Sequence, residues 1–132
     1  MELTHFENAV LQKLVAGPEA VLQILRAQLS RAALASRELT GVGFFCEFEV
    51  PADVPKVSPK DFVIGDVRGS IPGLANGAGF ILFVRNGIVD MLEGYSFDEP
   101  WPDRVETADL RYDSEPRRLP LTLQANGNQK TF

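Results

Sequence analysis

The chain has 132 residues, a formal net charge of -5 and a single cysteine, Cys46. A chain of this length forms one domain whose core is large enough to be stable without a metal or a disulfide, and one cysteine excludes an internal disulfide. The apolar runs are far shorter than the roughly 20 residues that cross a bilayer, and no secretory signal is visible. We therefore expect a cytoplasmic protein that does not bind membranes.

The N-terminal third of the chain is predicted to form two helices. Thr4-His5-Phe6-Glu7 has the spacing of a capping box, so the first helix begins near residue 5 and ends at Gly17-Pro18. From Pro18 to about Ser36, apolar residues recur every three or four positions and predict an amphipathic helix with Arg37 on its outward side. The short link makes the two helices neighbours, as an N-terminal helical hairpin.

A strand is predicted next, because the apolar period changes to two after Gly41. In this strand, residues 42–50, the core side holds Val42, Phe44, Cys46, Phe48 and Val50, and the opposite side holds Gly43, Phe45, Glu47 and Glu49. The proline-rich residues 51–61 form an exposed connection.

A second strand is predicted over residues 62–71. Its core side holds Val63, Gly65, Val67, Gly69 and Ile71, which leaves the alternate residues, among them Phe62 and Ile64, on the opposite side.

The clearest prediction is a β-hairpin. Phe80–Val84 and Ile88–Tyr95 are two extended runs joined by Asn86-Gly87, the dipeptide that most readily forms a type I′ turn. A weaker fifth strand is predicted over residues 105–112. The sum is an α+β fold, with an N-terminal helical hairpin packed on an antiparallel meander sheet of four to five strands. Residues 1–115 form this single domain, and residues 116–132 form a partly ordered C-terminal tail.

The second face of this sheet has a surplus of apolar residues. Strand 80–84 is apolar on both sides, and Phe45, Phe62 and Ile64 point away from the predicted core. Three groups could cover them: the Trp101 segment folded back as a rigid lid between two prolines, a second copy of the chain in a homodimer, or another partner.

The carboxylates are concentrated in one part of the chain. Residues 86–115 hold nine of the 18 acidic residues against only Arg104 and Arg111, a local charge of -7. A field of this sign repels phosphate backbones, so we expect no nucleic-acid binding and favour a basic protein partner. The alternative is that the charges only keep the surface hydrated.

Two groups of side chains are candidates for binding. Glu47 and Glu49 on one strand could meet Asp66 and Arg68 on another, as an ion pair on a wet surface or as part of a recognition site. The other group lies at the end of the predicted hairpin and in the segment that follows it, between Glu93 and Asp103. Together the candidate binding residues are Glu47, Glu49, Asp66, Arg68, Glu93, Tyr95, Asp98, Glu99, Trp101 and Asp103.

No residue set has a catalytic signature, and we expect no metal and no cofactor. His5 is the only histidine, Cys46 is expected to be buried as a small apolar residue, and the glycines of residues 73–79 lead into a strand instead of the helix that a phosphate loop needs. One alternative is a small-molecule-binding protein or hydrolase, with Glu93 or Asp66 as base in a pocket beside Trp101. Another is a homodimeric structural protein joined through the second sheet face.

The motifs TGVGFF at residues 40–45, IGDV at 64–67, GAGFILFV at 77–84 and MLEGYSFDEPWP at 91–102 run through most of the chain. In these motifs the sequence resembles an uncharacterised family of small, stand-alone bacterial proteins, to which no activity is assigned. The LEGY and WP stretch also resembles segments of immunity proteins that neutralise secreted bacterial toxins. No activity carries over from the first family. The local charge of -7 and the surplus of apolar residues on the second sheet face favour a non-enzymatic protein that uses the acidic hairpin exit and the mixed sheet face to bind a protein partner, and the likeness to immunity proteins implies a basic toxin-like enzyme as that partner.

Overall fold

The computed structural model describes residues 1–117. It confirms the α+β class, with two helices followed by six strands. These elements are α1 (His5–Leu14), α2 (Ala20–Arg31), β1 (Ala33–Leu39), β2 (Gly43–Glu49), β3 (Phe62–Ser70), β4 (Ala78–Arg85), β5 (Ile88–Ser96) and β6 (Asp109–Tyr112). Residues 118–132, most of the predicted tail, lie outside the described residues.

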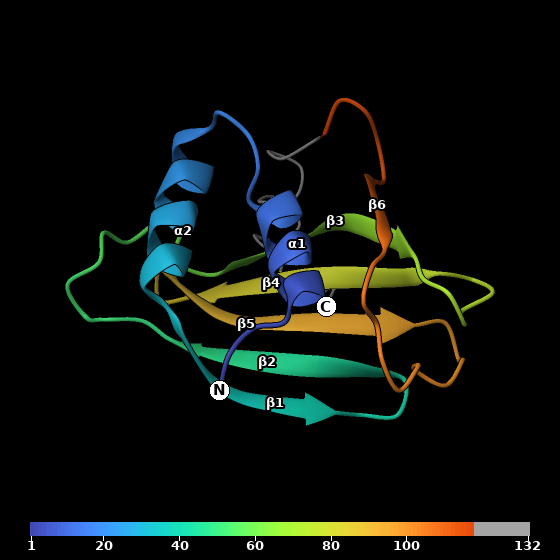
Figure 1. Ribbon diagram of the computed structural model, residues 1–132. Coiled ribbons are helices and arrows are strands. Elements are labelled where there is room, and N and C mark those ends of the chain that lie inside the picture. Colours follow the sequence, from blue (N-terminus) through green and yellow to red (C-terminus); the bar gives the residue numbers. More distant parts are fainter. Residues whose placement is uncertain (118–132) are drawn as a thin grey trace.

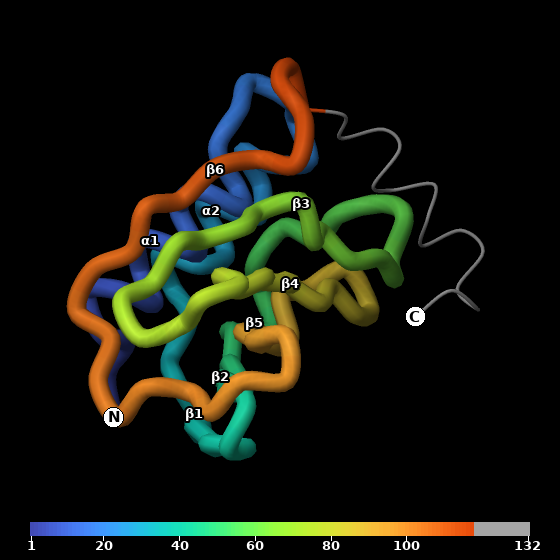
Figure 2. The backbone as a smooth tube through the Cα atoms, turned by 90° about the vertical axis from the view of Figure 1, so that its right-hand side faces the viewer, coloured from blue at the N-terminus to red at the C-terminus, as the bar shows by residue number. Residues whose placement is uncertain are grey.

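The six strands form one antiparallel sheet in the order β1-β2-β5-β4-β3-β6 (Figure 1). The prediction of a meander of four to five strands is therefore wrong. Only β3, β4 and β5 follow each other as a meander, whereas β2 pairs with β5 and β6 pairs with β3. The connections before β3 and after β5 are long enough to carry the chain past neighbouring strands, so sequence neighbours need not pair. The second connection, orange in Figure 2, passes the start of α1 on its way to β6.

The extra strand is β1, which the periodicity assigned to the end of the second helix. That helix ends at Arg31, and Ala32 is already extended, with φ -78° and ψ 146°. Residues 33–39 then pair with β2. The alanines there favour a helix, but pairing with β2 satisfies the backbone of this stretch and overrides that weak preference. As a consequence, Arg37 points into the protein and not outward as predicted.

Both helices lie on one face of the sheet, above the strands in Figure 1. Each contacts the sheet separately, α1 over β3 and β4 and α2 over β5. The capping box at the start of α1 is confirmed, with Thr4 and Glu7 each accepting a hydrogen bond from the backbone N–H of the other. The core between helices and sheet is built from fully buried side chains such as Leu14, Leu25 and Phe80.

The predicted hairpin is confirmed as β4 and β5, and Asn86 and Gly87 have the positive φ values, 56° and 78°, of its turn. Gln28 of α2 anchors this turn. Its side chain donates to the carbonyl oxygens of Pro55 and Gly87 and accepts from the N–H of Val89, all at 2.8 to 2.9 Å. A fully buried amide thus joins α2, the connection before β3 and the hairpin.

The predicted orientation of β3 is wrong in its first half. A β-bulge lies between Ile64 and Val67, where two residues of β3 face one residue of β4. The bulge reverses the alternation, so Phe62 and Ile64 before it are buried in the core together with Val67 after it. The second face of the sheet is therefore less apolar than the sequence suggested.

Candidate functional site

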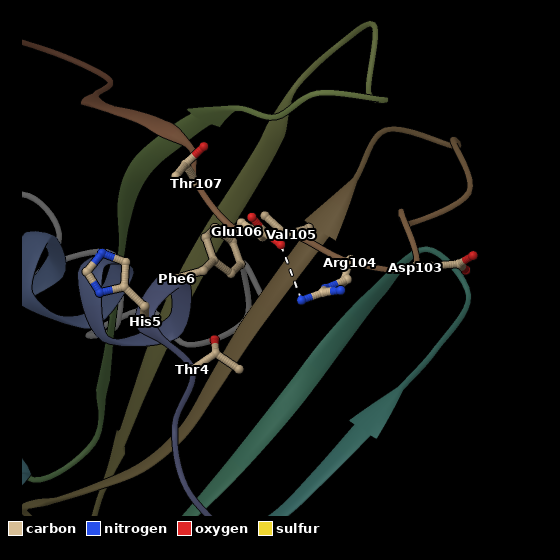
Figure 3. Close-up of a pocket in the computed structure, with 8 residues that line it drawn as sticks. All are labelled: Thr4, His5, Phe6, Asp103, Arg104, Val105, Glu106 and Thr107. Carbon is tan, nitrogen blue, oxygen red and sulfur yellow. Dashed lines mark ion pairs between the residues drawn. The ribbon is translucent and has the colours of Figure 1, made fainter.

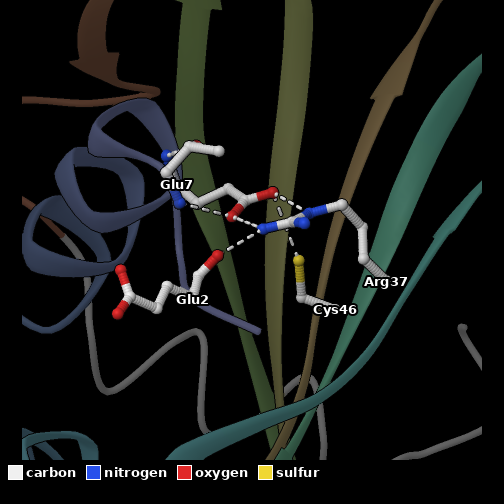
Figure 4. Close-up of polar contacts among 5 residues, drawn as sticks. Glu2, Glu7, Arg37 and Cys46 are labelled. Carbon is white, nitrogen blue, oxygen red and sulfur yellow. Dashed lines mark hydrogen bonds and ion pairs between the residues drawn. The ribbon is translucent and has the colours of Figure 1, made fainter.

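The helix-covered face contains a buried polar cluster (Figure 4). Arg37 of β1 donates two hydrogen bonds to the Glu7 carboxylate at 2.7 and 2.8 Å, and a third at 2.8 Å to the backbone oxygen of Glu2. The Cys46 thiol lies 3.5 Å from the same carboxylate. This cluster ties the N-terminal segment and α1 to β1 and β2.

The electrostatics of this cluster indicate structure and not catalysis. Burial alone would raise the pKa of Glu7, but the hydrogen bonds from Arg37 and Thr4 and the charge of Arg37 outweigh it and lower that pKa. Burial, with the nearby Glu7 carboxylate, raises the pKa of the Cys46 thiol to about 12. A thiol of that pKa is not a thiolate nucleophile at neutral pH.

The four strand residues Glu47, Glu49, Asp66 and Arg68 do not come together. Their strands, β2 and β3, are separated by β5 and β4, so the expected contact across a pairing is wrong. Asp66 instead accepts two hydrogen bonds from Arg117, at 2.8 and 2.9 Å. Arg117 also donates to the backbone oxygens of Leu14 and Ala16 at the end of α1, so ordered contacts extend two residues beyond the predicted domain boundary.

Trp101 packs on the helix-covered side of the sheet. Its ring packs edge-on against Phe44 at 5.6 Å between centroids, and the backbone N–H of Trp101 donates to the backbone oxygen of Gly41. Trp101 therefore covers the end of the core, so the alternative in which its segment folds back over the second face is wrong. Glu99 is likewise structural, since its carboxylate accepts from the backbone N–H groups of Ala75 and Asn76 at 2.7 and 2.8 Å.

An exposed apolar cluster lies beside the acidic exit of the hairpin. The turn between β1 and β2 adjoins the loop after β5 through the hydrogen bond from Ser96 N–H to the Val42 oxygen. The exposed large apolar side chains of residues 1–117 are Met1, Leu39, Val42 and Phe97. Val42 and Phe97 lie in these two neighbouring loops, and Leu39 is the last residue of β1, directly before the first of them. Asp98 and Asp103 are exposed in the same loop as Phe97. We call Leu39, Val42, Phe97, Asp98 and Asp103 the acidic end.

No described helix lies over the opposite face of the sheet (Figure 1). Its central side chains come from β2, β4 and β5, and all of them are half-buried except Glu47, which is exposed. We call them the uncovered face: Phe45, Glu47, Ile81, Phe83, Met91, Glu93 and Tyr95.

Tyr95 joins the uncovered face to the acidic end. Its ring crosses β4 above Gly79, its hydroxyl accepts from Arg68 at 3.0 Å, and its other side contacts Phe97 at 5.6 Å between centroids. A Cβ on residue 79 would lie 2.4 Å from the Tyr95 ring, so the close approach requires glycine there.

Four grooves lined by described residues lie elsewhere. One of about 590 Å³ runs between the start of α1 and the connection to β6, and is lined by residues that include His5, Asp103 and Glu106 (Figure 3). The three other grooves flank the same connection and are smaller, and none of the four is lined by Trp101, Glu93 or Asp66. Phe44 beneath Trp101 and Phe45 beside Glu93 are consecutive strand residues and point to opposite faces. Trp101 and Glu93 therefore do not share a pocket.

Within residues 1–117, no group of three or more His, Cys, Asp or Glu side chains is placed to hold a metal ion. The helices of this part of the chain are also too short and too polar to cross a membrane. Comparison with protein-family models, with curated proteins and with solved structures finds no match to this chain.

The sequence analysis placed Asp98 and Asp103 but missed the apolar half of the acidic end. Phe97 was visible as an aromatic residue directly beside the acidic stretch, which is a signal for a contact residue. Val42 was predicted on the core side of the strand, which is wrong, because β2 begins at Gly43 and the turn before it exposes Val42. Leu39 gave no signal, because its position depends on β1, which was not predicted.

Proposed function

We propose that this protein is a non-catalytic binding module that engages a basic protein through the acidic end. The observation that carries the proposal is that Leu39 at the end of β1, Val42 and Phe97 are exposed at two adjoining loops, beside Asp98 and Asp103. Exposed apolar side chains next to uncompensated charge are typical of a protein interface, in which apolar contacts give affinity and charge selects the partner.

The charge on this end favours a cationic partner. Neither Asp98 nor Asp103 forms an ion pair with a residue in the described range. Nucleic acids and anionic lipids are negatively charged, as the acidic end is, and are repelled by it. A basic protein is the macromolecule that this negative charge attracts. We place this binding in the cytoplasm, and a basic toxin-like enzyme, as the sequence resemblance implies, is the partner class to examine first.

Affinity capture from an extract of the source cells tests the proposal. The immobilised wild-type chain is compared with D98N/D103N, with F97S and with the matched control E2Q/E115Q, which removes two exposed carboxylates outside the acidic end. We expect a basic protein that is retained by wild type and by the control, and lost with both acidic-end variants.

Equal capture by all four chains would contradict the proposal, and so would a captured protein that is acidic. Asp98 has a positive φ of 63°, which asparagine tolerates as well as aspartate, so D98N is not expected to disturb the loop. Circular dichroism of each variant checks that the fold is unchanged.

A further inference from the structure

The middle of the uncovered face is an apolar surface interrupted by one carboxylate. Phe45, Glu93 and Ile81 lie directly opposite one another on β2, β5 and β4. The next row along the same strands brings Glu47, Met91 and Phe83 together. These apolar side chains are adjacent and half-buried, and an apolar patch of this kind on a sheet marks a surface that another group covers.

Glu93 has no polar partner in this surface. Its side chain forms no hydrogen bond and no ion pair with residues 1–117, although it stands between a phenylalanine and an isoleucine. Burial raises the pKa of this carboxyl, which means that the apolar neighbours disfavour its charge. An incoming cation at this position would favour the ionised form.

The charges around Glu93 have the same sign. Glu38 lies opposite Phe45 on β1, and Glu47 and Glu49 lie on β2, so the half of the face made by β1, β2 and β5 carries four carboxylates. No described residue forms an ion pair with any of the four.

The arginines of the other half do not compensate this charge. Arg68 is paired with Asp113 at 3.1 Å and Arg85 with Asp90 at 3.7 Å. A second copy of the chain would bring the same excess of carboxylates, whereas a basic segment would complement it.

We propose that the uncovered face binds a basic amphipathic segment of a protein, and that one lysine or arginine of this segment enters the row Phe45, Glu93 and Ile81 and pairs with Glu93. The apolar side chains of the segment cover Met91 and Phe83, and its other cations face Glu38 and Glu47. The inference rests on the proposed function, because the segment belongs to the same partner that binds the acidic end. The contact between Tyr95 and Phe97 makes the acidic end continuous with the uncovered face.

A peptide titration followed by NMR tests this inference. The probe is an octapeptide of alternating lysine and valine with blocked ends, added to the ¹⁵N-labelled full chain. The comparison peptides are octalysine and an octapeptide of alternating glutamate and valine. We expect the lysine-valine peptide to shift the amides of Phe45, Ile81 and Glu93 and to bind more tightly than octalysine, because only it offers both charge and apolar side chains.

Two variants isolate Glu93. E93Q should weaken binding of the lysine-valine peptide about tenfold, the loss expected from removing one partner of a partly desolvated ion pair. The matched control E106Q, which removes a carboxylate outside the face, should change the affinity less than twofold. Wild-type affinity should also rise with pH as the Glu93 carboxyl ionises, and this dependence should weaken in E93Q.

Three results would overturn the inference: equal affinity of wild type and E93Q, octalysine binding as tightly as the mixed peptide, or shifts confined to other strands. A concentration-dependent dimer, seen by sedimentation and with shifts in the same strands, would assign the face to a second copy instead. D98N/D103N should leave the peptide affinity unchanged. A negative peptide titration would therefore contradict only the inference about the uncovered face, and a negative capture experiment would contradict only the proposed function of the acidic end.

Discussion

Glu7 and Glu93 lie on opposite faces of the same sheet and have opposite surroundings. Glu7 is buried beneath α1 and accepts hydrogen bonds from Arg37 and the Thr4 N–H, so its pKa is lowered in spite of burial. Glu93 is half-buried among apolar side chains without a described partner, and burial raises its pKa. Burial of a carboxylate therefore has no fixed consequence, because the partners decide whether it stabilises the chain.

The difference extends to the faces themselves. On the helix-covered face, every fully buried side-chain nitrogen or oxygen of the described residues has a hydrogen-bond partner. A face whose polar groups are all satisfied is complete within one chain. The uncovered face keeps a charge that its own residues do not balance, and this is the physical reason to look there for an interaction.

The largest expected effect comes from breaking the Glu7 pair. E7Q keeps the shape of the side chain but leaves Arg37 without its countercharge. Removing one partner of a fully buried pair costs about 3 to 5 kcal/mol, and we expect about 2 to 3 here because water partly screens the arginine. Urea unfolding measures the loss, with E2Q, at an exposed carboxylate, as the control. A loss no larger than that of E2Q would show that the cluster contributes little.

Alanine substitutions at two glycines of central strands compare how tightly the two faces of the sheet are packed. A Cβ at Gly94 would lie 2.3 Å from the Phe44 ring on the helix-covered face, and one at Gly79 would lie 2.4 Å from Tyr95 on the uncovered face. Phe44 is held in the core, whereas Tyr95 and Arg68 can move outward. We expect G94A to cost about 2 kcal/mol and G79A less than about 1, by urea unfolding. Equal losses would mean that the uncovered face is packed as tightly as the core.

The sequence predicted those features that depend on local chemistry. The capping box at Thr4 and Glu7 and the Asn86-Gly87 turn are set by short-range hydrogen bonds and by backbone preference, and both were correct. β1 was missed because its alanines favour a helix in isolation, and only pairing with β2 makes a strand of them.

The residues of the candidate site also differ in whether local sequence could predict their positions. Strand order and the bulge before Val67 result from contacts between distant segments, so no local pattern could place Phe62 inside or separate Glu47 from Asp66. Asp98 and Asp103 were found because charge can be counted along the chain. That Trp101 covers the core end and not the second face could not be predicted, since it depends on the path of the connection to β6.

The smallest effect, and the most direct comparison of the two carboxylates, is the pH dependence of stability in E7Q and E93Q. Because the pKa of Glu7 is lowered by folding, its contribution is present at neutral pH and is lost as the pH falls through that lowered pKa. The pKa of Glu93 is raised by folding, so the wild-type chain loses stability as the pH rises through that value and the charge forms. Urea unfolding between pH 3 and 7 should therefore show E7Q falling further below wild type as the pH rises. E93Q should become more stable than wild type over the same range, by less than about 1 kcal/mol because water screens a half-exposed carboxylate. If E93Q instead lost stability at neutral pH, Glu93 would have a partner in its own chain, and the uncovered face would have no unbalanced charge to offer a basic segment.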